Sequence, residues 1–140
     1  MATLRLEIVT PEKRAYSEDV DMVVIPAAEG EMGVLPAHVP MVTQLLPGTL
    51  RITKGGQTSE LLVGSGFAEI TQTHVEVLTD MAMDDVDIDE GAAEEAMQRA
   101  QTALKERADD PDAREDWEAL LRRSMAQVQY KRRRRGQTGG

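Results

Sequence analysis

Apolar and polar side chains alternate with a period of two along much of the first half of the chain. In the segment 3–9, Leu4, Leu6 and Ile8 alternate with charged side chains. This pattern is typical of a strand with one buried face. Further short apolar runs lie at 20–25, 41–46, 49–54, 58–63, 67–71 and 74–79. Short strands that recur about every ten residues, with turn residues between them, predict an antiparallel sandwich or barrel.

Glycine and proline mark where these strands turn. Pro47-Gly48 suits the central positions of a type II turn, whose second central residue needs a positive φ. Gly55-Gly56 is a two-residue hairpin signal between two apolar runs. Gly64-Ser65-Gly66 interrupts the strand pattern and indicates a bulge or a turn.

The segment Glu29–Pro40 contains two glycines, two prolines, two glutamates and one of the chain's two histidines. Gly30 and Gly33 can take backbone angles that are closed to other residues, and Pro36 and Pro40 each fix one φ. We expect a stiff surface loop between strands, and loops held by a rigid scaffold often carry binding residues.

Three side chains of this segment are candidate binding residues. Glu29 and Glu31 would project from a rigid turn toward a partner of complementary charge, or they are ordinary solvated carboxylates. His38 follows an apolar stretch and is either a packed histidine or an interface residue. The residues alone leave both alternatives open.

The period of the apolar positions changes from two to three or four near Asp87, which predicts a helix over 89–108. Asp87 with Glu90 three residues later resembles a capping box at its start. Asp110 is placed as the N-cap of a second helix, with Pro111 at the first helical position. The sequence therefore predicts a helical hairpin.

The predicted contact face of the first helix is rich in alanine. Because each buried methyl or methylene group contributes only about 0.8 kcal/mol, the hairpin should be weakly docked. Such a module could open or move as a unit, or it is a permanently folded cap on the sandwich. The apolar positions are Ala93, Ala96, Met97, Ala100, Ala103 and Leu104 in the first helix, and Trp117, Leu120, Leu121, Ser124, Met125 and Val128 in the second.

Charge is distributed unevenly along the chain, whose net charge is −9. Residues 1–88 hold 14 acidic and 5 basic side chains, whereas residues 89–140 hold 11 of each. Every charged side chain after Glu118 is basic. An acidic body argues against nucleic acid as the main partner. The basic end is either a solvated terminus or a contact for an acidic protein.

The residues needed for catalysis or metal binding are scarce. Cysteine is absent, the two histidines are His38 and His74, and no nucleophile, phosphate-loop or zinc motif occurs. The sequence predicts neither catalytic residues nor a metal site. It also contains no secretory leader and no apolar run long enough to span a membrane, so we expect any membrane association to go through a partner.

Taken together, these segments resemble the epsilon subunit of the bacterial F-type ATP synthase over nearly the whole chain. The pattern E-G-E-x-G-x-x-P-x-H-x-P at Glu29–Pro40 is highly specific for that family. Leu46-Pro47-Gly48, Gly64-Ser65-Gly66-Phe67 and the transition at Asp87-Ile88-Asp89 into an alanine-rich hairpin match it as well.

The resemblance implies a rotor subunit that is not a catalyst. We expect a ten-stranded antiparallel sandwich over residues 1–86, a helical hairpin that could have a regulatory role over 87–135, and a disordered tail over 136–140. The sandwich would bind the gamma subunit and the membrane-embedded c-ring, so that ring rotation reaches the stalk. The implied c-ring contacts are Glu29, Gly30, Glu31 and Met32, and the implied gamma contacts are His38, Val39, Pro40 and Met41.

In the family, the helical hairpin either folds on the sandwich or extends along gamma into the catalytic head, where it blocks ATP hydrolysis. Basic residues then meet an acidic segment of the beta subunit. The matching residues here are Arg122, Arg123, Lys131 and Arg132, the last two belonging to the basic run 131–135.

Some family members bind ATP on the folded hairpin through an I/L-D-x-x-R-A motif. Asp89, Arg99 and Arg123 match positions of that site, but Ala92 replaces the motif arginine and Gln127 replaces a further arginine. The sequence therefore predicts weak or absent ATP binding and no other cofactor.

The resemblance also places one copy of the chain per complex, as a peripheral protein at the cytoplasmic face of the bacterial inner membrane. The competing hypothesis is a free-standing regulatory protein of the same fold that binds a nucleotide or another small ligand.

Overall fold

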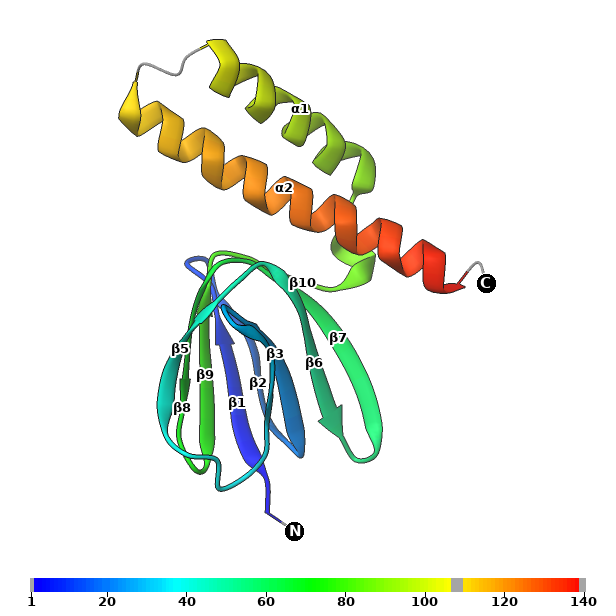
Figure 1. Cartoon of the computed structure of the whole chain (residues 1–140). Helices are drawn as coiled ribbons and strands as arrows, with labels where there is room; N and C mark the ends of the chain where they lie inside the picture. The colour runs from blue at the N-terminus through cyan, green and yellow to red at the C-terminus, as the bar shows by residue number, and fades with distance from the viewer. Residues whose placement is uncertain (1, 107–109, 139–140) are drawn as a thin grey trace. The chain divides into compact units, whose positions relative to one another are not determined.

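The computed structural model describes residues 2–106 and 110–138 and divides the chain into two compact units, with the boundary between Asp84 and Asp85 (Figure 1). This boundary lies two residues before the one predicted from the sequence. The first unit contains the strands β1 (Leu4–Val9), β2 (Arg14–Val20), β3 (Met22–Ala27), β4 (Gly30–Val34), β5 (Met41–Leu45), β6 (Gly48–Lys54), β7 (Gln57–Val63), β8 (Gly66–Ile70), β9 (His74–Thr79) and β10 (Ala82–Met83).

The strands form a ten-stranded sheet in the order β10-β7-β6-β3-β5-β8-β9-β1-β2, with β4 paired to β3. Every neighbouring pair is antiparallel except β1 and β9, which run parallel. The sheet curves round on itself, and the Lys54 ammonium of β6 donates a 2.5 Å hydrogen bond to the Glu18 carboxylate of β2. The predicted ten-stranded sandwich is confirmed, with this one parallel pair as the exception.

The core of the first unit is built from the alternating apolar positions of these strands. Leu4, Leu6 and Ile8 are fully buried, as their period of two predicts. They pack in one cluster with residues from eight further strands, β2 to β9. That cluster consists of Leu4, Leu6, Ile8, Val20, Val23, Ile25, Val34, Leu45, Leu50, Ile52, Val63, Ala68, Ile70, Val75 and Val77.

The two strands at the ends of the strand order, β2 and β10, were not predicted from the sequence. Residues 14–20 read Arg-Ala-Tyr-Ser-Glu-Asp-Val and lack apolar alternation, yet they pair with β1 from Leu4↔Val20 to Ile8↔Tyr16. Strand β10 is only two residues long. Because an outer strand has one strand neighbour, its backbone pairing can hold it in place without a continuous apolar face.

Two predicted turns have different outcomes. Gly55 and Gly56 have φ values of 59° and 79° and close the β6–β7 hairpin, as predicted. Gly48 begins strand β6 instead of taking the positive φ of a type II turn, so that prediction was wrong. A Cβ at Gly48 would lie 3.0 Å from the Cβ of Pro26, so a larger residue would force Pro26 to move by a few tenths of an ångström.

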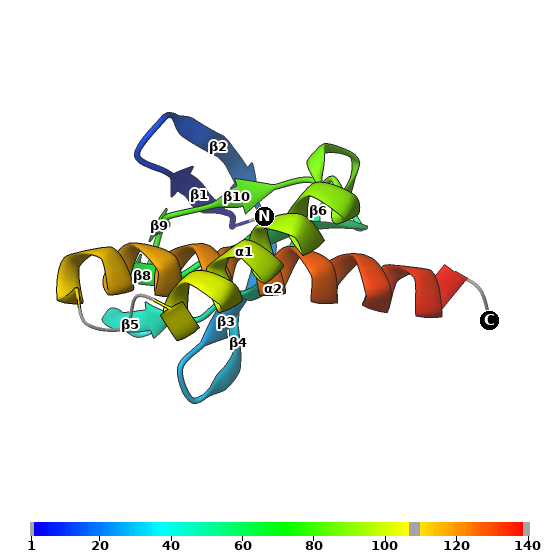
Figure 2. The same cartoon turned by 90° about the horizontal axis from the view of Figure 1, so that it is seen from above.

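The second unit contains the short 3₁₀ helix η1 (Asp85–Asp87) and the helices α1 (Glu90–Glu106) and α2 (Pro111–Thr138), which lie side by side (Figures 1 and 2). Asp89, not the predicted Asp87, caps α1: its carboxylate accepts a 3.1 Å hydrogen bond from the Ala92 N–H. Asp87 belongs to η1 and lies too early to reach the first turn. Asp110 caps α2 as predicted, accepting from the Asp112 N–H at 3.1 Å.

The ends and faces of the helices differ in detail from the prediction. Helix α2 continues through Gly136 to Thr138, so the disordered tail predicted from residue 136 is wrong up to residue 138. A single glycine costs about 1 kcal/mol in a helix without ending it. The remainder of that predicted tail, and the predicted end of the first helix at 107–108, lie outside the described residues. Met125, predicted on the apolar face, is exposed, whereas Ser124 and Val128 are buried.

Candidate interaction sites

The first half of the segment predicted as a stiff loop is a strand. Residues Gly30–Val34 form β4 and pair with β3 through Pro26↔Glu31 and Ile25↔Met32. Gly30, with φ of 120°, allows the tight turn from β3. The loop prediction failed here because glycines interrupt the alternation, whereas β3 supplies backbone partners and Val34 enters the core.

The predicted c-ring residues therefore lie at the tip of a β-hairpin, which extends from the neighbouring strands in Figure 2. Glu29 and Glu31 are both exposed. The Glu31 carboxylate accepts a 2.6 Å hydrogen bond from the guanidinium of Arg51 on β6 and forms an ion pair with it. Arg51 was missed in the sequence, because its proximity to Glu31 arises only when β3 lies between β6 and β4.

A shallow hollow of about 570 Å³ lies beside this hairpin. It is lined by residues 27–33 and by the start of β5, residues 41–43. The hollow brings all four predicted c-ring residues together with Met41, the last of the predicted gamma residues.

The predicted gamma residues follow a strained turn. Ala37 has φ of 69°, a left-handed angle that is uncommon outside glycine. Its N–H donates a 2.8 Å hydrogen bond to the Gln72 carbonyl, which fixes this turn to the β8–β9 connection. The Nδ1 of His38 lies 2.7 Å from the Val39 carbonyl, and Val39 and Pro40 are exposed. The turn thus presents a short apolar segment at the surface.

An exposed apolar face continues from this turn over strands β5, β8 and β9. Val42, Phe67 and Leu78 are 67%, 58% and 49% exposed. Phe67 is directly opposite Leu78 in the β8–β9 pairing, on the side of the sheet away from the buried Ala68. These residues were not predicted as binding residues from the sequence, although their positions in the alternation place them outside the core. We call Val42, Phe67 and Leu78 the apolar face.

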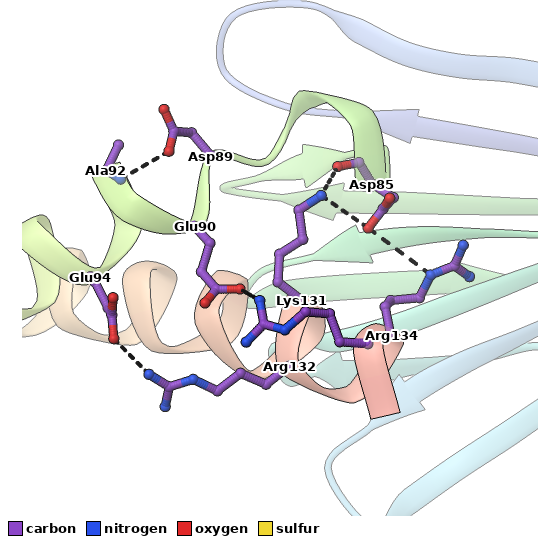
Figure 3. A network of polar contacts seen from close by, with 9 residues as sticks. Asp85, Asp89, Glu90, Ala92, Glu94, Lys131, Arg132 and Arg134 are labelled. Carbon is purple, nitrogen blue, oxygen red and sulfur yellow. Dashed lines mark hydrogen bonds and ion pairs between the residues drawn. The ribbon is translucent and has the colours of Figure 1, made fainter. Parts of the chain in front are cut away.

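The basic run at the end of α2 makes ion pairs within the second unit (Figure 3). The Lys131 ammonium lies 3.2 Å from the Asp85 carboxylate and donates a 2.6 Å hydrogen bond to the Asp85 carbonyl. Arg134 lies 4.0 Å from the same carboxylate. These two side chains tie η1 to α2.

Two further pairs join the start of α1 to α2 (Figure 3). Arg132 donates a 2.6 Å hydrogen bond to Glu94, and Arg135 pairs with Glu90. The hydrogen bond from Arg135 lowers the pKa of the Glu90 carboxyl, and the same bond raises the pKa of Arg135. We call Asp85, Glu90 and Glu94 the acidic strip, and Lys131, Arg132, Arg134 and Arg135 the basic end.

The other two predicted beta contacts lie elsewhere on α2. Arg122 and Arg123 precede Lys131 by eight or nine residues, which is about 12–14 Å along a helix. Arg122 is exposed. The four predicted residues therefore form two groups on one helix.

Of the three residues predicted from the nucleotide site, Asp89 and Arg99 have clear structural positions, at the start of α1 and within it. Asp89 caps α1. Arg99 lies about 15 Å further along the same helix, where it lines a shallow hollow of about 700 Å³ with Trp117. Arg123 and Asp89 do not line that hollow.

Two kinds of feature are absent from the described residues. No group of three or more histidine, cysteine, aspartate or glutamate side chains in 2–106 and 110–138 is placed to hold a metal ion. Within the same part of the chain, no helix is both long and apolar enough to cross a membrane.

The fold and these surfaces define a class of protein: a β-sandwich that presents an acidic hairpin tip and an apolar face, followed by a helical hairpin. Residues 3–85 match the family described as the ATP synthase delta/epsilon chain, beta-sandwich domain. Residues 87–131 match the family described as the ATP synthase delta/epsilon chain, long alpha-helix domain.

Individual relatives and a solved structure agree with these matches. The ATP synthase epsilon chain of Granulibacter bethesdensis is 52% identical over 104 residues, covering 74% of this chain and 77% of the relative. That of Halorhodospira halophila is 42% identical over 130 residues, covering 91% and 92%. A chain of the Euglena gracilis mitochondrial ATP synthase structure, OSCP/F1/c-ring in rotational state 1, matches with a TM-score of 0.68 and 28% identity, covering 87% of this chain and 77% of that one.

The chain belongs to the ATP synthase epsilon chain family and is a non-catalytic subunit of the central stalk. The resemblance found in the sequence is thereby confirmed. The hypothesis of a free-standing regulatory protein loses its support, since the matches to epsilon chains cover both units.

Proposed function

We propose that the subunit transmits rotation of the c-ring to the gamma subunit of a bacterial ATP synthase. It would do so in one copy, bound peripherally at the cytoplasmic face of the inner membrane. The observation that carries this proposal is the β3–β4 hairpin, which holds Glu29 and Glu31 exposed at the end of a paired, regular structure. A contact that transmits torque needs such stiffness, because a loose loop would absorb the motion.

The proposed c-ring contact consists of Glu29, Gly30, Glu31 and Met32. Two carboxylates at a hairpin tip suit a partner loop that carries basic side chains, since charge complementarity sets the register and orientation of an interface. Arg51 holds the Glu31 carboxylate in one position. This restraint reduces the side-chain entropy that binding would otherwise cost.

The proposed gamma contact consists of His38, Val39, Pro40 and Met41, and the apolar face extends it. Exposed apolar patches on a small protein mark interaction sites. Aromatic and aliphatic side chains form the centre of typical interfaces, which gives Phe67 a central position. The four residues of the proposed c-ring contact and Met41 of the proposed gamma contact line the same hollow between the β3–β4 hairpin and β5, which supports neighbouring contacts.

Two substitutions separate these contacts. Glu31→Lys reverses a charge at the hairpin tip, and Phe67→Ser removes the aromatic ring from the apolar face; both positions are exposed, so folding should be preserved. In pull-downs with purified subunits, we expect Glu31→Lys to weaken binding to the c-ring by about tenfold or more and to spare gamma. Phe67→Ser should have the opposite selectivity.

Glu12→Lys, an equal charge reversal at the exposed β1–β2 turn, is the control and should bind both partners normally. ATP-driven proton pumping by reconstituted complexes should fall with Glu31→Lys and not with the control. The proposal fails if Glu31→Lys and Glu12→Lys behave alike in both measurements.

We further propose that Arg122, Arg123, Lys131 and Arg132 contact an acidic surface of the beta subunit when the hairpin extends, and that this contact inhibits ATP hydrolysis. What supports it is the absence of acidic side chains after Glu118 and the exposure of Arg122 and Arg132. Truncation of α2 tests this proposal through the hydrolysis rate of the complex.

A further inference from the structure

The ion pairs of the second unit connect its first residues to the end of α2. Asp85 pairs with Lys131 and Arg134, Glu90 with Arg135, and Glu94 with Arg132. Acidic side chains at the start of the unit thus face basic side chains at its end. All three members of the acidic strip are used, and each meets at least one member of the basic end (Figure 3).

The apolar burial on α1 is modest. Among the residues of that helix described here, only Ala93 and Ala100 have buried side chains, while Met97 and Leu104 are half-buried. Because each alanine contributes a single methyl group, this burial favours the closed hairpin less than a row of buried leucines would. The ion pairs therefore supply a larger share of the closing free energy than they would in a leucine-rich hairpin.

The ion pairs of the acidic strip differ in solvent exposure, and the least exposed pair should contribute most to the free energy of closing the hairpin. The side chains of Lys131 and Asp85 are 21% and 35% exposed, and Lys131 also bonds the Asp85 carbonyl. Arg132 and Glu94 are more open to water, at 53% and 42%. A charge pair that is partly shielded from solvent is screened less by salt than one that is exposed. The Lys131–Asp85 pair should therefore be stronger than the Arg132–Glu94 pair.

We propose that the acidic strip is an ionic latch that holds the basic end of α2 in the closed hairpin and keeps it from external acidic partners. Asp85 pairs with Lys131 and Glu94 with Arg132, and these two cations are among those proposed to contact the beta subunit. The strip and the external surface then compete for the same charges. Closure of the latch follows from the contacts within this chain, whereas its effect on hydrolysis rests on the proposed function.

The latch can be tested on the isolated full-length subunit, which contains no cysteine. Spin labels at Gln98→Cys on α1 and Gln129→Cys on α2, both exposed positions, report the distance between the helices. We expect a narrow distance distribution at low salt. Glu90→Gln with Glu94→Gln should raise the population at long distances by about two- to thirtyfold, the range for two exposed pairs, and about 1 M salt should do the same to the unmutated strip.

Two controls make this result specific. Glu95→Gln removes the same charge from an exposed α1 position that is not part of the strip, and it should leave the distribution narrow. The exchange Glu94→Arg with Arg132→Glu restores an ion pair of reversed polarity and should close the hairpin again, whereas Glu94→Arg alone should open it. Equal distributions for Glu95→Gln and the Glu90/Glu94 double variant would overturn the latch.

The rate of ATP hydrolysis by the assembled complex distinguishes the latch itself from its proposed effect on inhibition. The Glu90→Gln, Glu94→Gln double variant keeps the whole basic end, so it should inhibit ATP hydrolysis more strongly than the wild-type chain. If the distances broaden and hydrolysis is unchanged, the latch stands and the beta contact fails. If the distances stay narrow, the latch itself is overturned, whatever the hydrolysis rate.

Discussion

Single ion pairs join strands that are not neighbours in the hydrogen-bonded sheet. Lys54 on β6 reaches Glu18 on β2, and its hydrogen bond lowers the pKa of the Glu18 carboxyl, while the same bond raises the pKa of the Lys54 ammonium. Arg51 on β6 similarly reaches Glu31 on β4. At the scale of residues, two side chains of strand β6 thus contribute to the closure of the sheet and to the position of the proposed c-ring carboxylate.

The lowered pKa of Glu18 predicts a dependence of stability on pH. Because the folded-state pKa lies below the ordinary value of about 4.3, the pair stabilises the fold above that pH, and the contribution is lost as the pH falls through the lowered pKa. The raised pKa of Lys54 gives the upper limit: the contribution is lost as the pH rises through that value.

Thermal unfolding followed by circular dichroism measures this dependence. Glu18→Gln should have a lower Tm than the wild-type chain at pH 7, and the difference should disappear in acid below the lowered Glu18 pKa. Glu12→Gln at the β1–β2 turn is the matched control and should show no such pH-dependent difference. A Glu18→Gln difference that persists unchanged in acid would contradict the assignment.

At the scale of elements, the hairpins and helices are positioned by their ends. Gly55 and Gly56 close one hairpin, Gly30 opens another, and the helices begin at Asp89 and Asp110. Each of these residues satisfies a local backbone requirement, so its effect depends on neighbours along the chain and not on long-range packing. The β4 strand is the exception, because its pairing with β3 overrides a sequence that reads as a loop.

The two candidate caps of α1 give a direct comparison. Asp89→Ala should destabilise the helical unit by about 1 kcal/mol, since it removes the acceptor for the Ala92 N–H. Asp87→Ala should change the free energy of unfolding by no more than about 0.5 kcal/mol. Urea unfolding followed by the helical signal measures both, and a larger effect at Asp87 would show that the cap is misassigned.

At the scale of the whole molecule, two units with different kinds of stabilisation follow one another. Residues 2–84 have a large aliphatic core, whereas α1 buries only small side chains and its partners at the end of α2 are charged. Such a division suits a subunit in which a rigid part transmits force and a more labile part changes conformation.

Truncation after Asp110 tests this division in the assembled complex. A chain that retains residues 1–110 keeps the proposed c-ring and gamma contacts and loses α2, so ATP synthesis should be retained while ATP hydrolysis rises. The binding of the truncated chain to gamma serves as its control for folding. An unchanged hydrolysis rate with normal assembly would remove the inhibitory role proposed for α2.

The sequence by itself determined the features that depend on neighbours along the chain. The alternation of Leu4, Leu6 and Ile8 predicted a buried strand face, Gly55-Gly56 predicted a hairpin, and Asp110 predicted a helix cap, because each rests on local backbone or side-chain geometry. The motif at Glu29–Pro40 was sufficient to identify the family.

Only the tertiary structure determined the contacts between segments that are separated along the chain. It made a strand of Gly30–Val34, placed Arg51 against Glu31, exposed Phe67 beside Leu78, and paired the basic end with the acidic strip. Apart from the β3–β4 pairing, these contacts join residues separated by 11 to 49 positions, from Phe67 and Leu78 to Asp85 and Arg134. Local periodicity carries no information about such pairs, since the strand order and the antiparallel packing of the helices bring them together.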